Sequence, residues 1–378
     1  MKQLDLQLLN ENIDQIAQYD LNRNKISGSA YYVCQGRTFK TTLTKCYGTA
    51  SSQSNLPITD TSLFRLASMT KPVTAVAALI LIDRGLLSLD DPISKYLPGF
   101  TNIHVISKDG TDFGRPSRQP LIRDLLTHTS GIGSDPAKHQ VMTSSDKQTL
   151  DASIDYYLRV GLDFEPGSQQ LYSGVGAFDV MARIIELISD TDYLTFLKHE
   201  IFEPCGMEDT TFEPSSRQWQ QIVAMHTHID GKNTHRTMPS GCIFEDYPCT
   251  HYLGGAGLVS SLKEYSRFAQ MLLNNGRTSQ TQLISSHTFR LLCTPQVSKQ
   301  IMPGAERWGL GVRVITEDSY PYLPVGTFGW SGAYGSHFWV DPENELIAVY
   351  MKNSQIDGGA GNESARKFEE AVYRSLHC

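Results

Sequence analysis

Long hydrophobic runs are absent from this 378-residue sequence, and no stretch approaches the roughly 20 apolar residues that a helix needs to cross a bilayer. Residues 1–20 also lack the basic start and apolar core of a secretion signal. Basic clusters are missing as well, and 33 Lys and Arg against 40 Asp and Glu give a formal charge of −7. Membrane insertion and nucleic-acid binding are therefore not expected.

Cysteine is sparse, and its pattern indicates no disulfide framework or zinc site. The seven cysteines are odd in number, scattered, and never spaced as Cys-x-x-Cys. We therefore expect free thiols and a reduced compartment, the cytoplasm. His226, His228 and His235 could be considered as a metal set, but no acidic or cysteine ligand accompanies them at a known spacing. The alternation within VAMHTHI favours a strand, so the sequence predicts no metal and no cofactor.

One apolar segment stands out, residues 64–87 with the sequence FRLASMTKPVTAVAALILIDRGLL. Nearly every side chain in residues 73–82 is apolar with no polar face, which predicts a helix that is buried on all sides. Pro72 lacks an amide hydrogen and fits only the first turn of a helix, so this helix begins close to Ser68. Gly85 is expected to end it. The sequence thus predicts a central buried helix that starts at a Ser-x-x-Lys tetrapeptide.

Ser68 and Lys71 lie one helical turn apart on the same face, at the positive end of the helix dipole, so their side chains can touch. A serine hydroxyl becomes a nucleophile when a neighbouring base takes its proton, and a lysine amine can be that base when burial or nearby positive charge lowers its pKa. The alternative is a capping serine and a lysine whose stem lies along the helix, because the tetrapeptide is common by chance.

Secondary-structure signals around this helix indicate an antiparallel sheet flanked by helices. A helix near the amino terminus is predicted because Leu6, Leu9, Ile13 and Ile16 recur at helical spacing. Two β-rich runs, 29–34 and 37–47, are predicted to form a hairpin joined at Gln35-Gly36. Further strands are predicted over 310–314, 337–340 and 346–351, and further helices over 122–126, 148–159, 176–189, 193–202, 261–274 and 363–376, the last of which should pack beside the first helix.

This order of elements predicts a mixed α/β (α+β) fold with two domains. Residues 1–85 and 255–378 are expected to form one discontinuous α/β domain, and residues 86–254 a mostly helical domain. The glycine-rich stretch 254–257 is expected to be a flexible joint between them. A site that uses Ser68 would then lie in the cleft where the two domains meet.

Two further segments carry candidate chemistry. Tyr172 follows FEPGSQQL and precedes an amphipathic helix, and a phenol near a cationic lysine can share a proton with it. The segment FGWSGAYG (328–335) precedes a predicted strand, and its small residues would let the backbone approach a bound acyl group, with the Ala333 N–H free to donate to an oxyanion. Taken alone, the first is also typical of packing and the second of a glycine-rich turn.

In this order, the segments resemble the serine β-lactamase and penicillin-binding-protein superfamily, with class C β-lactamases and family VIII carboxylesterases as the nearest groups. The resemblance spans almost the whole chain and implies a β-lactamase/transpeptidase-like fold. Besides the Ser-x-x-Lys, the matching pieces are LIRDLLTHTSGIG (121–133), FEPGSQQLYSG (164–174), IFEPCGMEDTTF (201–212), YLGGAGLVSSLKEYSRFAQMLL (252–273) and FGWSGAYGSHFWVDP (328–342). No Gly-x-Ser-x-Gly occurs, so an α/β-hydrolase elbow is not supported.

The resemblance implies a role for each matching residue. Ser68 would be the acylated nucleophile, Lys71 its base partner and Tyr172 the tyrosine of the second motif. Ala333 and Ser68 would supply the two N–H groups of the oxyanion hole. His128, in the HTSG turn, is interpreted as structural. The third motif of the lactamases, Lys-Thr-Gly, corresponds here to Trp330, Ser331 and Gly332.

Two departures from the lactamase pattern bear on the substrate. Trp330 replaces the lysine that normally meets the carboxylate of a β-lactam or a D-Ala-D-Ala peptide. Gly174 replaces the asparagine of Tyr-x-Asn, which removes a side-chain amide that would bind an acyl amide. The sequence therefore predicts a serine hydrolase that cleaves small neutral carboxylic esters. The alternatives are a class C-like β-lactamase or D-Ala peptidase, an acyltransferase on the same site, and a sensor that is acylated without turnover.

Overall fold

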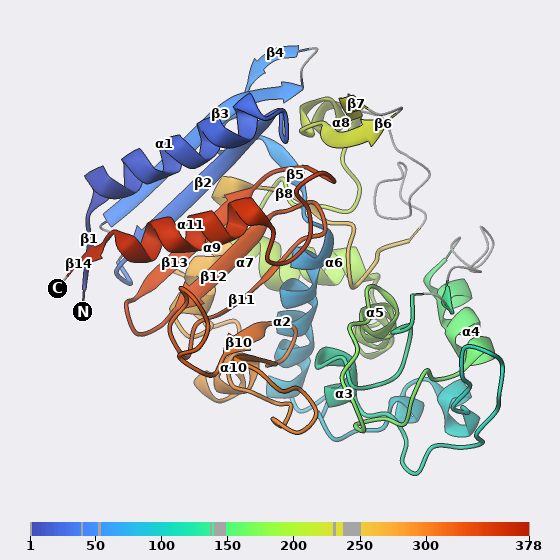
Figure 1. The fold of residues 1–378 in the computed structure, drawn as a ribbon. Coiled ribbons are helices and arrows are strands. Elements are labelled where there is room, and N and C mark those ends of the chain that lie inside the picture. Colours follow the sequence, from blue (N-terminus) through green and yellow to red (C-terminus); the bar gives the residue numbers. More distant parts are fainter. Residues whose placement is uncertain are drawn as a thin grey trace.

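The computed structural model describes residues 2–38, 41–51, 54–136, 138–139, 149–229, 232–236 and 251–377. An eight-stranded sheet, antiparallel throughout, forms the larger layer of the molecule (Figure 1). One of its interior pairings joins strands far apart in sequence, with Tyr31 opposite Tyr350. Across the sheet the strands are β4 (Ser54–Pro57), β3 (Thr41–Ser51), β2 (Gly28–Gln35), β13 (Leu346–Met351), β12 (His337–Asp341), β11 (Phe328–Ser331), β10 (Arg313–Ile315) and β9 (Glu306–Trp308).

The two faces of the sheet pack against different helices, because side chains alternate along each strand. Ala348 and Tyr350 of β13 join the cluster under α1 (Leu6–Asn22) and α11 (Glu363–Arg374). Ile347 and Val349 join the larger core, which holds α9 (Leu262–Leu273) and the central helix. Figure 1 shows α1 and α11 side by side on one face, with both chain ends nearby. The predicted packing of the first and last helices is confirmed.

The central helix has the predicted position. It comprises a 3-10 turn (Ala67–Met69) and α2 (Thr70–Asp83), and residues 70–81 are all buried. Gly85 follows with a φ of +71°, a left-handed conformation that suits glycine and stops the helix. Each large aliphatic side chain buried here contributes about 1.5–3 kcal/mol. Helices α5 (Gly176–Ser189) and α10 (Ser286–Cys293) pack directly on α2.

Residues 86–254 contain the predicted helices and some short strands. Helices α3 (Ile122–Leu126) and α5 have the predicted bounds, and α4 (Leu150–Val160) is close to them. The predicted helix over 193–202 is divided into α6 (Tyr193–Leu197) and a π-helical turn (Lys198–Phe202), followed by α7 (Glu203–Cys205). Beyond α8 (Ser216–Gln221), β6 (Met225–Ile229) pairs with β7 (Lys232–Arg236).

The division of the chain into an α/β domain and a mostly helical domain stays a prediction.

Two further short strand pairs lie outside the large sheet, and two predicted elements differ from the structure in their bounds. Strand β5 (Leu63–Arg65) pairs with β8 (Val259–Ser261), and β1 (Gln3–Leu4) pairs with β14 (Leu376–His377). The predicted two-residue turn at Gln35-Gly36 is wrong, because Gln35 pairs with Thr41 and Arg37 therefore lies in the loop rather than in the second strand. Likewise the strand predicted over 310–314 is β10, which begins at Arg313 because Gly311 (φ +72°) turns the chain against α2.

Several sequence predictions concern groups away from the central helix. Cys34, Cys46, Cys205 and Cys293 are free thiols, and the other three cysteines lie outside the described residues. His226 Nε2 lies 2.6 Å from the Asn24 carbonyl oxygen, whereas the side chains of His228 and His235 lie outside the described part of the chain. Within the described ranges, no helix has the length and apolar character needed to cross a membrane.

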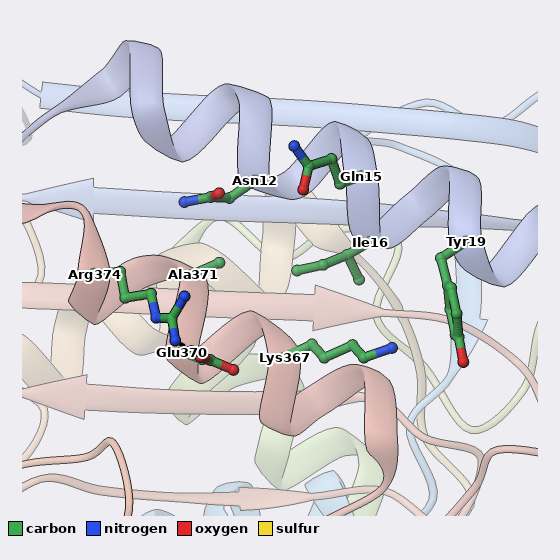
Figure 2. Close-up of a pocket in the computed structure, with 8 residues that line it drawn as sticks. All are labelled: Asn12, Gln15, Ile16, Tyr19, Lys367, Glu370, Ala371 and Arg374. Atoms are coloured by element: carbon green, nitrogen blue, oxygen red, sulfur yellow. Dashed lines mark ion pairs between the residues drawn. The ribbon is translucent and has the colours of Figure 1, made fainter.

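A cavity of about 290 Å³ lies between α1 and α11, on the face of the sheet opposite the central helix (Figure 2). Ile16 and Ala371 form its apolar part. Its charged groups are engaged with their neighbours, since Arg374 pairs with Glu370 and the Lys367 ammonium lies 3.5 Å from the centroid of the Tyr19 ring. The Lys367–Tyr19 contact joins the two terminal helices, whereas the Arg374–Glu370 pair lies within α11.

Candidate active site

Ser68 lies in the 3-10 turn that leads into α2. The preceding residue, Ala67, has a φ of +45°, which is uncommon for a residue with a side chain. Ala67 and Met69 are buried, whereas Ser68 is partly exposed. The backbone thus presents the Ser68 hydroxyl at the start of a helical run, where the first N–H groups have no intrahelical partner.

The Lys71 ammonium is buried and hydrogen-bonded on three sides. Its Nζ lies 3.3 Å from Ser68 Oγ, 2.6 Å from the Gly174 carbonyl oxygen and 2.8 Å from the Gly255 carbonyl oxygen. The side chain is fully buried. The structure therefore brings the two Ser-x-x-Lys side chains together, and it supplies backbone carbonyls as the other partners of the lysine.

The segment at Gly254 and Gly255 is fixed against the central helix, so the flexibility predicted for this joint is wrong. Thr74 donates its hydroxyl to the Gly254 carbonyl at 2.5 Å, and the Gly254 N–H donates to Asp179 at 3.0 Å. A Cβ at Gly255 would lie 3.0 Å from the Gly174 oxygen and 3.2 Å from Lys71 Nζ. Glycine at 255 therefore allows the close approach that directs its carbonyl to the lysine.

Tyr172 lies beside Lys71 and contacts the third motif. The Lys71 ammonium is 4.9 Å from the centroid of the Tyr172 ring, a cation–π distance. The Tyr172 hydroxyl accepts a hydrogen bond from Trp330 Nε1 at 3.3 Å, and the two rings are 5.4 Å apart. The second and third motifs thus meet through Tyr172 and Trp330.

Ser331, although adjacent to Trp330, is engaged elsewhere. Its Oγ lies 2.8 Å from His337 Nδ1, and His337 Nε2 lies 2.9 Å from a carboxylate oxygen of Glu369 on α11. All three side chains are buried. This hydrogen-bonded chain ties the end of β11 to the terminal helix layer.

Gly332 and Ala333 follow β11 close to the Ser68 turn. A Cβ at Gly332 would lie 2.4 Å from the Leu66 carbonyl oxygen, so only glycine lets the two backbones approach in this way. The Gly332 carbonyl accepts the Gly335 N–H at 3.0 Å, which fixes the peptide plane shared with the Ala333 N–H. Within the described residues, no hydrogen bond uses that N–H. It is available to an acceptor.

Gly174 is exposed, and nothing lies within 4 Å of the position that its Cβ would take. Its carbonyl binds Lys71, so its backbone belongs to the site. The open space on its side-chain face is where the lactamase pattern has an asparagine amide.

Two residues next to Tyr172 were not predicted as site residues. The His128 ring centroid lies 4.5 Å from that of Tyr172, and Trp308 stacks on Tyr172 at 5.9 Å. Burial lowers the pKa of His128 well below the ordinary value of 6.5, and the positive charge of Lys71 adds to this effect, so the imidazole is neutral. The HTSG motif marked His128 only as part of a turn, and no sequence signal pointed to Trp308.

The arrangement can support acyl transfer chemistry. A partly exposed hydroxyl contacts a buried amine, the Tyr172 ring lies beside that amine, and a backbone N–H is unoccupied nearby. Among the described residues, no group of three or more His, Cys, Asp or Glu side chains could hold a metal ion.

Comparison with known proteins shows the relationships of the chain. A family model described as Beta-lactamase matches residues 11–371. Protein Rv1367c of Mycobacterium tuberculosis (strain ATCC 25618 / H37Rv) is 31% identical over 366 residues, covering 85% of this chain and 88% of that protein. Esterase EstB of Burkholderia gladioli is 27% identical over 393 residues, covering 95% of this chain and 94% of that protein.

Solved structures show the same fold. EstCE1, described as a hydrolase with promiscuous acyltransferase activity, superposes with a TM-score of 0.81 at 24% identity and covers 97% of this chain and 99% of its own. Simvastatin synthase (LovD) from Aspergillus terreus, unliganded, superposes with a TM-score of 0.78 at 19% identity, covering 98% of each chain. The resemblance noted in the sequence is confirmed, and the chain belongs to the beta-lactamase family of serine hydrolases.

Proposed function

We propose that this protein is a carboxylesterase that hydrolyses small neutral esters through an acyl-enzyme on Ser68. The observation that carries the proposal is the contact between Ser68 Oγ and the buried Lys71 Nζ, beside a third motif that presents an indole and no cation. The family accounts for a serine hydrolase, and the neutral third motif favours an ester as its substrate.

The proposed reaction uses the site as follows. The Lys71 ammonium first releases one proton to solvent, and the resulting amine takes the proton of Ser68 while Oγ forms a bond to the acyl carbon. The Ala333 and Ser68 N–H groups stabilise the resulting oxyanion. When the bond to the alkoxide breaks, the Tyr172 hydroxyl gives the departing oxygen a proton and recovers one from the lysine. Water then hydrolyses the acyl-enzyme by the same steps in reverse.

The side chains at the third motif support a neutral substrate. Trp330 donates its indole N–H to Tyr172 and offers no positive charge to a carboxylate. Hydrogen bonds to charged groups contribute about 1.5–3 kcal/mol, so the loss of such a partner weakens binding of a carboxylate by one to two orders of magnitude. Gly174 provides no amide for an acyl amide. A small ester requires neither group.

The names of relatives also support an ester as the substrate. Esterase EstB of Burkholderia gladioli matches along nearly all of this chain. A putative D-alanyl-D-alanine carboxypeptidase of Escherichia coli (strain K12) is 29% identical over 332 residues and covers 81% of this chain and 72% of that protein. Such a peptidase acts on a carboxylate-bearing peptide, for which Trp330 offers no partner.

The proposal is tested by comparing kcat/KM for a short p-nitrophenyl ester and a chromogenic cephalosporin. Wild-type protein is expected to prefer the ester by at least tenfold, and Ser68→Ala is expected to lose hydrolysis of both. Trp330→Lys is expected to move the ratio toward the cephalosporin by about tenfold, because it restores a cation. Preference of wild-type protein for the cephalosporin would overturn the ester assignment.

Two further measurements separate an esterase from an acylated sensor and from an acyltransferase. Continuous turnover of the ester supports hydrolysis, whereas one stoichiometric burst without turnover supports an acylated sensor. Addition of alcohol acceptors measures the fraction of acyl groups transferred to an alcohol instead of water. An ester product that dominates over the free acid would identify an acyltransferase.

A further inference from the structure

His128 holds the backbone on both sides of Tyr172. The Leu171 N–H donates to the His128 carbonyl oxygen at 3.1 Å, and the Ser173 N–H donates to His128 Nδ1 at 3.1 Å. One residue therefore accepts from both neighbours of Tyr172. Because both distances lie within the normal range for N–H···O and N–H···N bonds, they fix the Gln170–Leu171 and Tyr172–Ser173 peptide planes on either side of the tyrosine.

The conformation of His128 makes this double contact possible. Its φ is +59°, a left-handed conformation that is rare and unfavourable for a residue with a side chain. The turn is held in place by the adjacent pairing, in which Gly167 N–H donates to the Thr129 carbonyl and Asp163 N–H to the Gly131 carbonyl. The chain thus keeps a histidine where asparagine or glycine would be easier to accommodate.

The imidazole ring also contacts the tyrosine ring directly. Its centroid lies 4.5 Å from that of Tyr172 and 4.4 Å from that of Trp308, and the side chain is fully buried. Because Nδ1 accepts a hydrogen bond, the proton of the neutral ring is on Nε2. That Nε2 has no hydrogen-bond partner among the described residues, and the adjoining aromatic faces are the groups that can receive its N–H.

We propose that His128 is a positioning residue for Tyr172, which fixes the tyrosine ring beside Lys71. This inference rests on the proposed function, in which Tyr172 transfers a proton. His128 touches no reacting atom, and it acts through the two hydrogen bonds that bracket Tyr172 and through the ring that packs on it.

The test uses a graded pair of substitutions in the full-length protein. His128→Asn keeps a residue that tolerates positive φ and an acceptor in the place of Nδ1, but it removes the ring. His128→Gly also tolerates the conformation, and it removes both the ring and the acceptor. Ser130→Ala is the matched control, because it removes a hydroxyl from the same turn that accepts the Ile132 N–H.

Turnover is measured per active site, with the sites counted by titration with a fluorophosphonate that bonds to Ser68 as fluoride leaves. We expect kcat to fall about tenfold in His128→Asn and about 100-fold in His128→Gly, with KM changed less than threefold. The pH profile of kcat should move in both variants. Ser130→Ala should keep the wild-type kcat and pH profile even if it is less stable.

A structural role alone would give a different result. If the variants lose stability while kcat per titrated site and the pH profile stay as in wild type, the positioning role is wrong. The rate of fluorophosphonate labelling of Ser68 supplies a readout that does not depend on the substrate. Labelling is expected to be fastest in wild type, slower in His128→Asn and slowest in His128→Gly. If no ester is hydrolysed in a Ser68-dependent way, the proposed function fails, whereas the labelling rates still decide the role of His128.

Discussion

Lys71 and Lys352 are both fully buried, but they are held by different partners. Lys352 Nζ lies 2.6 Å from a carboxylate oxygen of Asp357 and 3.1 Å from Asn362 Oδ1. Lys71 has two backbone carbonyls and the Ser68 hydroxyl instead, and no carboxylate lies within ion-pair distance of it in the described ranges. One lysine is paired with an anion, and the other is bound only by neutral groups.

The difference indicates two kinds of function. A buried ion pair is stable as long as both partners remain, so Lys352 has the partners of a structural residue. It also lies behind the turn that carries Ala333, where a Cβ at Gly335 would be 2.1 Å from Lys352 Cε. Neutral partners leave the Lys71 amine free to exchange a proton with Ser68, as the proposed reaction requires.

The largest effects are expected when either lysine is replaced, on ester hydrolysis for Lys71 and on stability for Lys352. Lys71→Met should lower kcat/KM for the ester by about 10³-fold or more, because Ser68 loses its base, while the protein remains folded. Lys352→Met should destabilise the protein by about 3 kcal/mol or more, because Asp357 is left buried without its cation. Its turnover per titrated site should stay within tenfold of wild type.

Ester hydrolysis and urea unfolding measure these two quantities on the same preparations. The catalytic role of Lys71 is wrong if Lys71→Met keeps wild-type turnover. The structural role of Lys352 is wrong if Lys352→Met leaves the free energy of unfolding unchanged.

A second test concerns the approach of the third motif to the Ser68 turn. Gly332→Ala would bring a Cβ to 2.4 Å from the Leu66 carbonyl oxygen, which should push β11 and the Ala333 N–H away from Ser68. We expect kcat to fall by about 10²-fold, as when an oxyanion-hole donor is removed. Gly174→Ala is the control, because its Cβ meets nothing within 4 Å, and it should change kcat less than threefold. Equal losses in the two variants would contradict this interpretation.

The smallest expected effect is on the dependence of stability on pH. Burial alone would raise the pKa of Asp357, but the charge of Lys352, with hydrogen bonds from Lys352 and Ser364, outweighs it and holds the pKa at about 2, below the ordinary value of 3.8. The folded-state pKa is lower than the unfolded one, so the pair stabilises the fold above pH 3.8. That contribution is lost as the pH falls from 3.8 toward 2.

Urea unfolding at a series of pH values checks this contribution. Wild type should be more stable than Asp357→Asn at neutral pH, and the difference should shrink across this acidic window. A difference that stays constant down to pH 2 would show that Asp357 does not titrate as described.

Patterns local in the sequence predicted much of the fold. The buried helix after Ser68 and the helix over residues 176–189 follow from apolar periodicity and from their punctuation by Pro72 and glycine. Leu9, Ile13 and Ile16 are buried as their spacing indicated, although Leu6 is 37% exposed because it lies at the first position of the helix. The meeting of Ser68 and Lys71 required only that they share one helical face.

Contacts between distant segments could not be predicted in this way. The carbonyl partners of Lys71 are 103 and 184 residues away in sequence, and backbone groups leave no mark in a motif. The position of Ser331 depends on the pairing of β11 with β12 and on Glu369 of α11, which turn its hydroxyl to His337. His128 and Trp308 reach Tyr172 only through the packing of α3, β9 and the loop before α5.

The central claim, that Ser68 carries the acyl group, is tested most directly by mass spectrometry of the protein quenched in acid during turnover of a p-nitrophenyl ester. The account predicts a mass increase of one acyl group, located on Ser68 by peptide mapping, and no such adduct in Ser68→Ala. An acyl group mapped to another residue, or an undiminished rate of hydrolysis in Ser68→Ala, would contradict it.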